Sequence, residues 1–386
     1  MRIAHLADLH LGYRAYHRAT PRGTNVREAD VADAFRRAVA RTVELRPDLV
    51  LVAGDVFHTV RPGNTAIADA FRQFSVLTEG LPGVPVVMIA GNHDSPRSAD
   101  TGNILALFRE IDGVTVVADE CRPVHLPALD ATVLCMPHNS LAVEEGEPVV
   151  MNPDPKARHN ILMLHGTVGG AAAEQKMRYV TEFGGAVVQD TAIGPERWDY
   201  VALGHYHIAT DLAPNMWYAG AIERTSTNLW QETGEKGFIL YDTDTGRGEL
   251  HPVETRPVVD LPRISARGKT GAEVDEAIRS AVDSVEGGIA GKIVRLVVAD
   301  VPRHVVRELN HRRIRDWKAE ALHFHLDARP PEVRRRAASG APVRRQTLAE
   351  QVESFLGRHW TLTSPDLKRE RLVELGTGYV RQAEEG

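Results

Sequence analysis

The stretch 85–94, PVVMIAGNHD, decides how this chain folds. Its first six residues form a short apolar run, which is typical of a strand covered on both faces. The run ends directly in Gly91-Asn92-His93-Asp94, so three polar side chains follow the predicted strand. In layered α/β folds, sites form at the carboxyl ends of parallel strands. The stretch therefore predicts an α/β protein with a functional site at that edge of a sheet.

The same arrangement occurs repeatedly within the first 255 residues, where apolar runs alternate with helical patterns such as 30–45. The runs are followed by five polar motifs: Asp8-x-His10, Gly54-Asp55-x-x-His58, Gly91-Asn92-His93-Asp94, His165-Gly166 and Gly204-His205-x-His207. Each motif alone is weak evidence, because a lone histidine is more often a core or surface residue than a ligand. Together they predict one shared site, because buried strands rarely end in His and Asp unless those groups are paired or bind metal.

The residue types in these motifs favour a site for metal ions. Carboxylate, imidazole and amide ligands without thiolate suit manganese, iron or zinc, and argue against a structural cysteine-type zinc site. The candidate ligands are Asp8, His10, Asp55, Asn92, His165, His205 and His207. One ion cannot use so many ligands, but with one shared carboxylate they provide four for each of two ions. Two ions about 3.5–4 Å apart can activate water and hold a phosphodiester for in-line attack.

Composition narrows the class of protein. The chain has 386 residues, of which 43% are hydrophobic and 25% charged, as in average soluble globular proteins. Its 46 basic and 52 acidic residues exclude a uniformly basic nucleic-acid coat, so any DNA-binding surface must be local. Apolar runs such as 86–90 are far shorter than the ~20 residues of a membrane helix. Two cysteines and a start without a signal-like segment lead us to expect a cytoplasmic protein.

The sequence pattern changes after about residue 255. Segments 272–285 and 302–318 have helical periodicity, and 292–299 and 321–326 resemble strands, which predicts a small α+β domain. Segment 328–345 contains three prolines and six arginines and has no apolar period, so we expect a basic linker. Two amphipathic helices follow it. The expected parts are therefore 1–255, an α/β domain that carries the five motifs; 256–328, a small α+β cap; 329–346, a linker; and 347–386, a helical segment.

One glycine-rich segment, Gly287–Lys292 (GGIAGK), has only a superficial likeness to a phosphate-binding loop. Glu286 stands where the first glycine is required, and Ile293 replaces the Ser or Thr that binds the metal ion of a nucleotide. We therefore expect no nucleotide site in this chain, and any ATP-driven motor would be another chain.

Taken together, the five motifs resemble those of the calcineurin-like metallophosphoesterases. Within this superfamily the chain is most similar to the SbcD or MRE-eleven type of DNA double-strand-break repair nuclease. Two features carry that resemblance: Tyr218-x-Gly220-x-x-Glu223-Arg224, followed by Lys236-Gly237-Phe238, and the order of cap, linker and helix pair. The family often has Gly-Ser where this chain has Gly220-Ala221. The resemblance implies a four-layer αββα sandwich with a small α+β cap domain and C-terminal helices.

The resemblance also implies a role for each motif residue. The first metal ion would be held by Asp8, His10, Asp55 and His207. The second would be held by Asp55, Asn92, His165 and His205, so that Asp55 bridges the two. His93 would stabilise the transition state and protonate the leaving 3′ oxygen, which suits an imidazole that titrates near neutrality. His58 would stand close to the substrate, and Asp94 would orient His93.

The activity and the partners follow from the same resemblance. We expect manganese-dependent 3′–5′ exonuclease activity on duplex DNA and endonuclease activity on single strands, with two manganese ions and iron or zinc as alternatives. An SbcC-like ABC-type coiled-coil ATPase would bind 347–386, unless this segment packs on its own domain. A homodimer would form through the helices after the second and third motifs, which carry Ile104, Leu105, Leu107 and Phe108, and one or two of these four would be ordinary core residues. The basic residues of 303–315 and 334–336 either contact DNA or are simply solvated, and the cell compartment would be the nucleoid-associated cytoplasm.

Two other functions stay open at this point. The first is a small-molecule metallophosphodiesterase or phosphatase, which would turn over model diesters without preferring DNA. The cap, linker and tail disfavour it, because a small substrate does not require them. The second is a non-catalytic scaffold with the same fold. Such a scaffold should lack ligands, whereas this chain lacks none, and fewer than two metal ions per chain at saturation would favour it.

Overall fold

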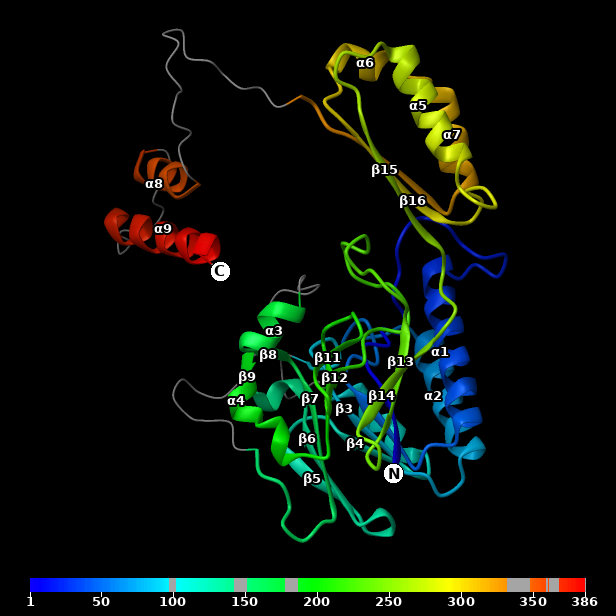
Figure 1. Cartoon of the computed structure of the whole chain (residues 1–386), viewed down its shortest axis with the longest axis vertical. Helices are drawn as coiled ribbons and strands as arrows, with labels where there is room; N and C mark the ends of the chain where they lie inside the picture. The colour runs from blue at the N-terminus through cyan, green and yellow to red at the C-terminus, as the bar shows by residue number, and fades with distance from the viewer. Residues whose placement is uncertain are drawn as a thin grey trace.

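The computed structural model of the chain describes residues 1–96, 102–141, 151–177, 187–331, 348–358, 360 and 368–385. Its larger part, residues 2–252, consists of two six-stranded sheets that pack face to face, with helices on their outer faces (Figure 1). We call this part the sandwich. The layers confirm the predicted α/β class and the αββα order, and they explain the continuous apolar runs, since each central strand is covered on both sides.

The first sheet has the strand order β14-β13-β1-β2-β3-β4, in which β1 to β4 are parallel. Its strands are β1 (Arg2–Leu6), β2 (Leu49–Ala53), β3 (Val86–Ile89), β4 (Val114–Val117), β13 (Gly237–Asp242) and β14 (Arg247–Pro252). Its outer face is covered by α1 (Val26–Leu45), α2 (Asn64–Gly80) and the 3₁₀ helix η2 (Ile104–Glu110).

The helix α1 begins at Val26, earlier than the periodicity predicts, because Asn25 caps it. The Asn25 side chain accepts hydrogen bonds from the backbone N–H groups of Arg27 and Glu28, which satisfies donors that would otherwise lack partners. The helix ends at a left-handed residue, Arg46 (φ 49°), just before a proline. Between these two ends, the apolar face of the helix packs on the first sheet.

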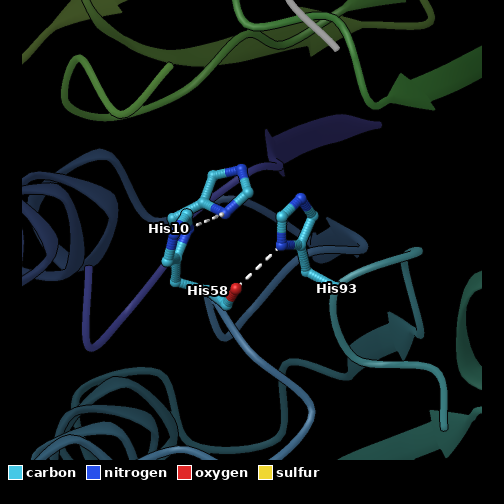
Figure 2. Close-up of side chains that lie close together, drawn as sticks. All are labelled: His10, His58 and His93. Atoms are coloured by element: carbon cyan, nitrogen blue, oxygen red, sulfur yellow. Dashed lines mark hydrogen bonds between the residues drawn. The ribbon is translucent and has the colours of Figure 1, made fainter. Parts of the chain in front are cut away.

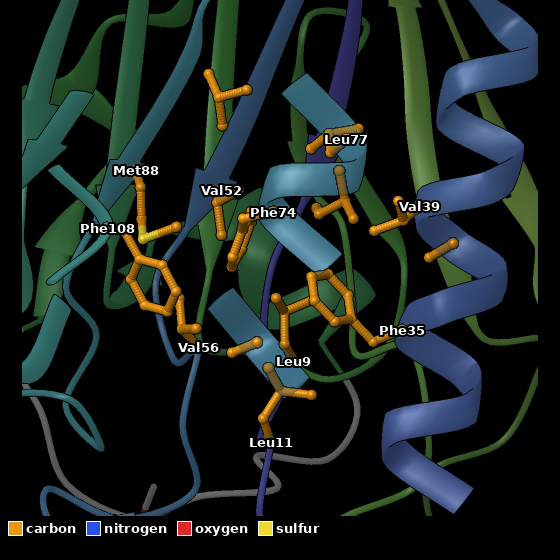
Figure 3. Packing of buried hydrophobic residues seen from close by; sticks show 14 of the residues in the cluster. Leu9, Leu11, Phe35, Val39, Val52, Val56, Phe74, Leu77, Met88 and Phe108 are labelled. Carbon is orange, nitrogen blue, oxygen red and sulfur yellow. The ribbon is translucent and has the colours of Figure 1, made fainter. Parts of the chain in front are cut away.

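Aromatic side chains fill the space between these helices and the first sheet (Figure 3). Phe35 of α1 and Phe108 of η2 flank Phe74 of α2, with ring centroids 5.2 and 5.0 Å from that of Phe74. They pack against Val52 and Met88 of β2 and β3. This layer supports the strands whose ends carry the polar motifs.

Burial of two residues of η2 shows which part of the expected dimer surface is core. Leu105 and Phe108 are fully buried in the core of their own chain, because η2 lies directly against the first sheet. Val76 of α2 and Leu107 of η2 are exposed, at 44% and 38%, and Ile104 is partly exposed. These side chains are available to a partner surface.

The second sheet has the order β11-β12-β10-β7-β6-β5. Its strands are β5 (Arg122–Leu126), β6 (Ala131–Met136), β7 (His159–His165), β10 (Tyr200–Gly204), β11 (Thr210–Ala213) and β12 (Met216–Tyr218). Its outer face carries α3 (Ala171–Lys176), α4 (Asp190–Ile193), the ribbon β8 (Thr167–Gly169) with β9 (Val187–Gln189), and the 3₁₀ turns η4 (His138–Leu141) and η5 (Pro195–Arg197). A further 3₁₀ turn, η3 (Pro127–Leu129), joins β5 to β6. Between the sheets, buried His5 of β1 has its Nδ1 2.8 Å from the Tyr200 hydroxyl of β10.

Residues 258–328, which we call the cap, form a separate α+β unit with its own core. Three parallel strands, in the order β15 (Val258–Ser265), β16 (Ile293–Ala299) and β17 (His323–Ala328), are joined by α5 (Gly271–Asp283), α6 (Arg303–Glu308) and α7 (His311–Glu320). The single helix predicted over 302–318 is wrong. The chain becomes extended at Leu309 (ψ 149°), and the Asn310 side chain caps α7 by accepting from the Arg313 N–H.

The cap docks on the sandwich through few groups. The Arg256 guanidinium pairs with Asp30 of α1, and the Tyr16 ring stacks on His323 of β17 with centroids 4.1 Å apart. Arg18 donates to backbone carbonyls at the end of α7. A small apolar cluster, made by Leu229, Ile293 and Leu322, completes the junction.

The C-terminal segment contains the two predicted helices, α8 (Leu348–Arg358) and α9 (Arg369–Glu385), which pack on each other. Most of the predicted basic linker lies outside the described residues. Of the helices that the structure describes, none combines the length and the apolar character needed to cross a membrane.

Candidate metal centre

The polar motifs meet at one edge of the sandwich, where central strands of both sheets end. Asp8 and His10 follow β1, Asp55 follows β2, and Asn92 and His93 follow β3 of the first sheet. His165 is the last residue of β7, and His205 and His207 follow β10 of the second sheet. The fold therefore brings all seven predicted ligands together with His93, as expected for the carboxyl ends of parallel strands.

Strained turns aim the first three ligands inward. Asp8, His10 and Asp55 have positive φ angles of 50°, 47° and 51°, which non-glycine residues rarely adopt. Two backbone hydrogen bonds hold these turns to each other, from Asp8 N to Gly54 O and from His10 N to Asp55 O, at 3.0 and 2.9 Å. Strain of this kind persists only where the surrounding structure compensates for it, and it is common at functional sites.

Two motif glycines allow the loops to approach closely. A Cβ atom on Gly91 would lie 2.1 Å from Asp55 Oδ1, and one on Gly54 would lie 2.3 Å from His165 Nδ1. Any side chain at either position would displace a candidate ligand. The Gly-Asp and Gly-Asn-His-Asp motifs thus need glycine for steric reasons.

One group of potential ligands consists of Asp8, His10 and His207, whose nearest nitrogen and oxygen atoms all lie within 4.8 Å of one another. His10 Nε2 and His207 Nε2 are 2.9 Å apart. The Asp8 carboxylate is oriented by the backbone N–H of His205, which donates to both of its oxygens at 2.9 and 3.1 Å. All three side chains are fully buried.

A second group forms around Asp55 and His165. The His165 Nδ1 donates to the Ala53 carbonyl at 2.7 Å, and because a carbonyl only accepts, this bond assigns the proton to Nδ1. His165 Nε2 lies 3.0 Å from Asn92 Oδ1 and 3.4 Å from Asp55 Oδ2. The same Asn92 oxygen lies 3.0 Å from His205 Nδ1. Four potential ligand groups therefore face one another.

This arrangement fits divalent metal ions. Asp55 Oδ2 is buried and accepts no hydrogen bond from any residue that the structure describes, although it lies 3.4 Å from His165 Nε2 and 3.8 Å from His10 Nε2. Buried acceptors of this kind are costly unless a cation or proton neutralises them. Asp8, Asp55 and His165 also form a set whose ligand atoms lie within 4.8 Å of one another, so one ion could bind on each side of Asp55.

The charges of the site are strongly coupled. Burial raises the pKa of Asp8 to about 6. Burial is the largest single influence on both groups and would raise the pKa of Asp55 and lower that of His165, but several attractions together outweigh it. His165, His10 and His93 hold the pKa of Asp55 well below its ordinary value, and Asp55, Asp8 and the Ala53 carbonyl raise the pKa of His165 to about 10. Without a metal ion the cluster thus retains a proton, which metal binding would have to displace.

Three histidines, His10, His58 and His93, form one wall of the site (Figure 2). His93 Nδ1 donates to the His58 carbonyl at 2.7 Å, and the backbone N–H of His93 donates to Asp55 Oδ1 at 2.8 Å. These bonds leave His93 Nε2 as the ring nitrogen that can exchange a proton with a bound molecule. His58 and His93 are only half-buried, so substrate can reach them, whereas His10 is fully buried.

The position of Asp94 differs from the predicted one. Its buried carboxylate accepts hydrogen bonds from the backbone N–H groups of Val56, Phe57 and Gly91, at 2.9 to 3.1 Å. The hydrogen bond that orients the His93 ring comes from the His58 carbonyl instead. Asp94 therefore ties together the loops that carry Asp55 and Asn92, and it influences His93 through the backbone of those loops.

Sequence reasoning missed one buried acid beside the site. Glu232 lies 3.5 Å from His207 Nδ1 and pairs with Lys236, which the sequence analysis noted only as part of a motif. No apolar strand precedes Glu232, so the pattern that revealed the other residues gives no signal there. His138 of η4 also borders the site, with its ring centroid 6.2 Å from that of His165.

Comparisons with known proteins agree with this geometry. Residues 1–209 match the family model of the calcineurin-like phosphoesterases. The chain is 28% identical over 211 residues to the DNA double-strand break repair protein Mre11 of Methanococcus maripaludis, which is 54% of this chain and 52% of that protein. It is 26% identical over 300 residues to the Mre11 protein of Methanocaldococcus jannaschii, 74% and 73% of the two chains. The similarity to the Mre11 protein of Aeropyrum pernix, at 24% identity, covers 97% of this chain and 86% of that one. The chain thus spans about half the length of the first of these relatives.

Proposed function

Because the chain belongs to the calcineurin-like phosphoesterase family, we propose that it is a manganese-dependent DNA nuclease that hydrolyses phosphodiesters with two metal ions. The observation that carries the proposal is the convergence of seven ligand side chains and His93 on the common edge of two sheets. We place it in the SbcD type of break-repair nuclease, acting as a 3′–5′ exonuclease on duplex DNA and as an endonuclease on single strands.

Each ion has a proposed set of four ligands. Asp8, His10, Asp55 and His207 would hold the first ion. Asn92, His165 and His205 would hold the second ion together with Asp55, which both sets share. When bound, the two ions lower the pKa of a water molecule and neutralise the phosphate charge. Manganese fits the mixture of carboxylate, imidazole and amide ligands, and iron or zinc would be accepted by the same ligand types.

The chain's own groups perform the proton chemistry in this proposal. His93, held at Nδ1 by the His58 carbonyl, presents Nε2 to the phosphate and protonates the leaving 3′ oxygen. His58 lies beside it, where it contacts the substrate. Asp94 keeps both ligand loops in register by binding their backbone amides.

DNA is the proposed substrate because the Mre11 relatives carry that function in their names and because the chain has a second unit, the cap, beside the site. The cap helices α6 and α7 expose several arginines that could meet phosphates. We also propose that α8 and α9 bind an SbcC-like ATPase, since they expose Leu348, Phe355 and Tyr379. We further propose that the chain forms a homodimer through α2 and η2. Its proposed compartment is the nucleoid-associated cytoplasm.

The test is digestion of end-labelled linear duplex DNA with manganese, comparing the native chain with His93→Asn. We expect manganese-dependent shortening from the 3′ end, and a loss of about 10²–10⁴-fold in the variant, because it removes only the proton donor. Metal content should be equal in the two proteins, since His93 is not among the proposed ligands.

Other outcomes would revise the proposal. Turnover of a small diester without any DNA digestion, with or without an added ATPase partner, would identify a small-molecule phosphodiesterase. Digestion that appears only when the partner is added would keep the nuclease but make the partner obligatory. Fewer than two metal ions per chain at saturation, with neither activity, would point to a scaffold.

A further inference from the structure

A buried ion pair lies directly behind the candidate ligand His207. Glu232 and Lys236 are 1% and 3% exposed, and the two side chains contact each other. Burying two charges costs free energy that their attraction often does not recover, so such a pair is weak evidence for a stabilising role. Its position beside a candidate metal ligand suggests a different use.

Glu232 is held rigidly by several partners. Its Oε1 accepts hydrogen bonds from the backbone N–H groups of Thr225 and Ser226, at 3.2 and 2.6 Å, and its Oε2 pairs with the Lys236 ammonium. The loop 225–232 is thereby closed on itself. Leu229 of the same loop packs on the cap residues Ile293 and Leu322, which anchors the loop from its other side.

The pair holds His207 at two points. Glu232 Oε1 lies 3.5 Å from His207 Nδ1, and the Lys236 ammonium donates to the backbone carbonyl of His207 at 2.7 Å. A carboxylate can only accept, so it favours the tautomer with the proton on Nδ1. The Nε2 lone pair of His207 is then directed towards His10 Nε2, only 2.9 Å away, where the first ion would bind.

We propose that Glu232 is the positioning residue for His207, selecting the tautomer and ring orientation with which this histidine binds the first metal ion. The inference deepens the proposed function and rests on it, because it presupposes the metal site. Carboxylates that hydrogen-bond the outer nitrogen of a ligating histidine raise its basicity, and losing one typically weakens metal binding about 10–100-fold. Glu232 touches no reacting atom in this scheme and acts only through His207.

The test is a calorimetric manganese titration of the native chain, Glu232→Gln and the matched control Glu235→Gln. Glu235 is exposed and only three residues away, so it controls for removing an acid from this segment. We expect the native chain and Glu235→Gln to bind two ions with the same affinities. In Glu232→Gln, the affinity of one of the two sites should fall about 10–100-fold while the other site is unaffected.

Two further variants separate positioning from folding. The double variant Glu232→Gln with Lys236→Met removes the pair without leaving an unpaired buried charge, so it should fold and still show the selective loss. In a His207→Asn background, Glu232→Gln should have no further effect on metal affinity, because the group through which it acts is gone. A purely structural role would lower both affinities in every background.

The two proposals can fail separately. If the native chain binds fewer than two ions, the metal site and the proposed function fail. If the native chain binds two ions and both the single and the double variant keep native affinities at both sites, Glu232 does not position His207 and the inference is overturned.

Discussion

The sandwich and the cap differ in what holds their functional parts in place. In the sandwich, six of the seven candidate ligands are at most 3% exposed, and their loops are tied together by strained turns and buried hydrogen bonds. The cap has its own core, and its contacts with the sandwich include those of Arg256 and Arg18, one aromatic stack, the Arg295 guanidinium over the Trp230 ring and a small apolar cluster. Packing therefore fixes the site, whereas a few replaceable contacts fix the orientation of the cap.

The strongest test of this contrast is to weaken the packing under the site. Phe74→Ala removes the ring between Phe35 and Phe108 in the helix layer of the first sheet, where Phe74 is 1% exposed. We expect the free energy of unfolding of the sandwich to fall by about 3–5 kcal/mol, measured by urea denaturation. Phe71→Ala, on the same helix but only half-buried, is the control and should cost clearly less. Equal losses would show that the layer is not tightly packed.

The next test concerns the independence of the two cores. Ile278 of α5 is fully buried in the cap, so Ile278→Ala should lower the stability of the cap by about 2–5 kcal/mol. Native-state hydrogen exchange should show reduced protection in β15 to β17, while the amides of β1 to β3 keep theirs. A parallel loss of protection in β1 to β3 would mean that sandwich and cap unfold as one unit.

A smaller effect arises between the two sheets of the sandwich. Burial lowers the pKa of His5 to about 3, from an ordinary 6.5. Below pH 6.5 the unfolded chain binds a proton at His5 that the folded chain does not. The contribution of His5 to the free energy of unfolding is therefore fully present above pH 6.5 and is lost as the pH falls towards 3. Between pH 8 and pH 5 the free energy of unfolding should fall by about 2 kcal/mol through this group.

The measurement is urea denaturation of the native chain and His5→Gln at both pH values. The variant cannot titrate, so its loss of stability over this range should be about 2 kcal/mol smaller. Tyr200→Phe keeps the histidine in the same apolar layer and should retain the native pH dependence. An identical pH dependence in His5→Gln would show that His5 is not the group responsible.

The smallest expected effect is at the junction of sandwich and cap. Arg18→Ala removes hydrogen bonds to the carbonyls of Lys318, Ala319 and Ala321, of which the first two are solvent-exposed bonds and the third is partly buried. We expect a loss of about 1 kcal/mol in cap docking, with both cores intact. Small-angle X-ray scattering should show a wider distribution of cap positions. The control is Arg22→Ala, which replaces an exposed arginine of the same loop and should leave the scattering unchanged. If Arg22→Ala widens the distribution as much as Arg18→Ala does, Arg18 has no specific role in docking the cap.

The sequence was informative where an apolar strand ends in a polar motif. Five candidate ligands lie at or directly after the strand that positions them, so the sequence pattern alone predicts where they lie in the fold. They are Asp8, Asp55, Asn92, His165 and His205. The α/β layers follow from the same runs, because continuous apolar strands need cover on both faces.

Other features depend on contacts that no local pattern contains. Glu232 reaches His207 only because a loop 25 residues further along the chain folds back over it. The sequence does not tell which of the four apolar residues in 104–108 are core, and only the position of η2 on the first sheet shows that Leu105 and Phe108 are buried. The break between α6 and α7 depends on one extended residue, Leu309, within an otherwise helical pattern.

The most direct test of the two-metal site is a crystal of the native chain soaked in manganese, with anomalous diffraction recorded at the manganese edge. The geometry predicts two anomalous peaks on either side of Asp55, one beside Asp8, His10 and His207 and the other beside Asn92, His165 and His205. A single peak, or peaks away from these side chains at full manganese saturation, would contradict the two-metal site.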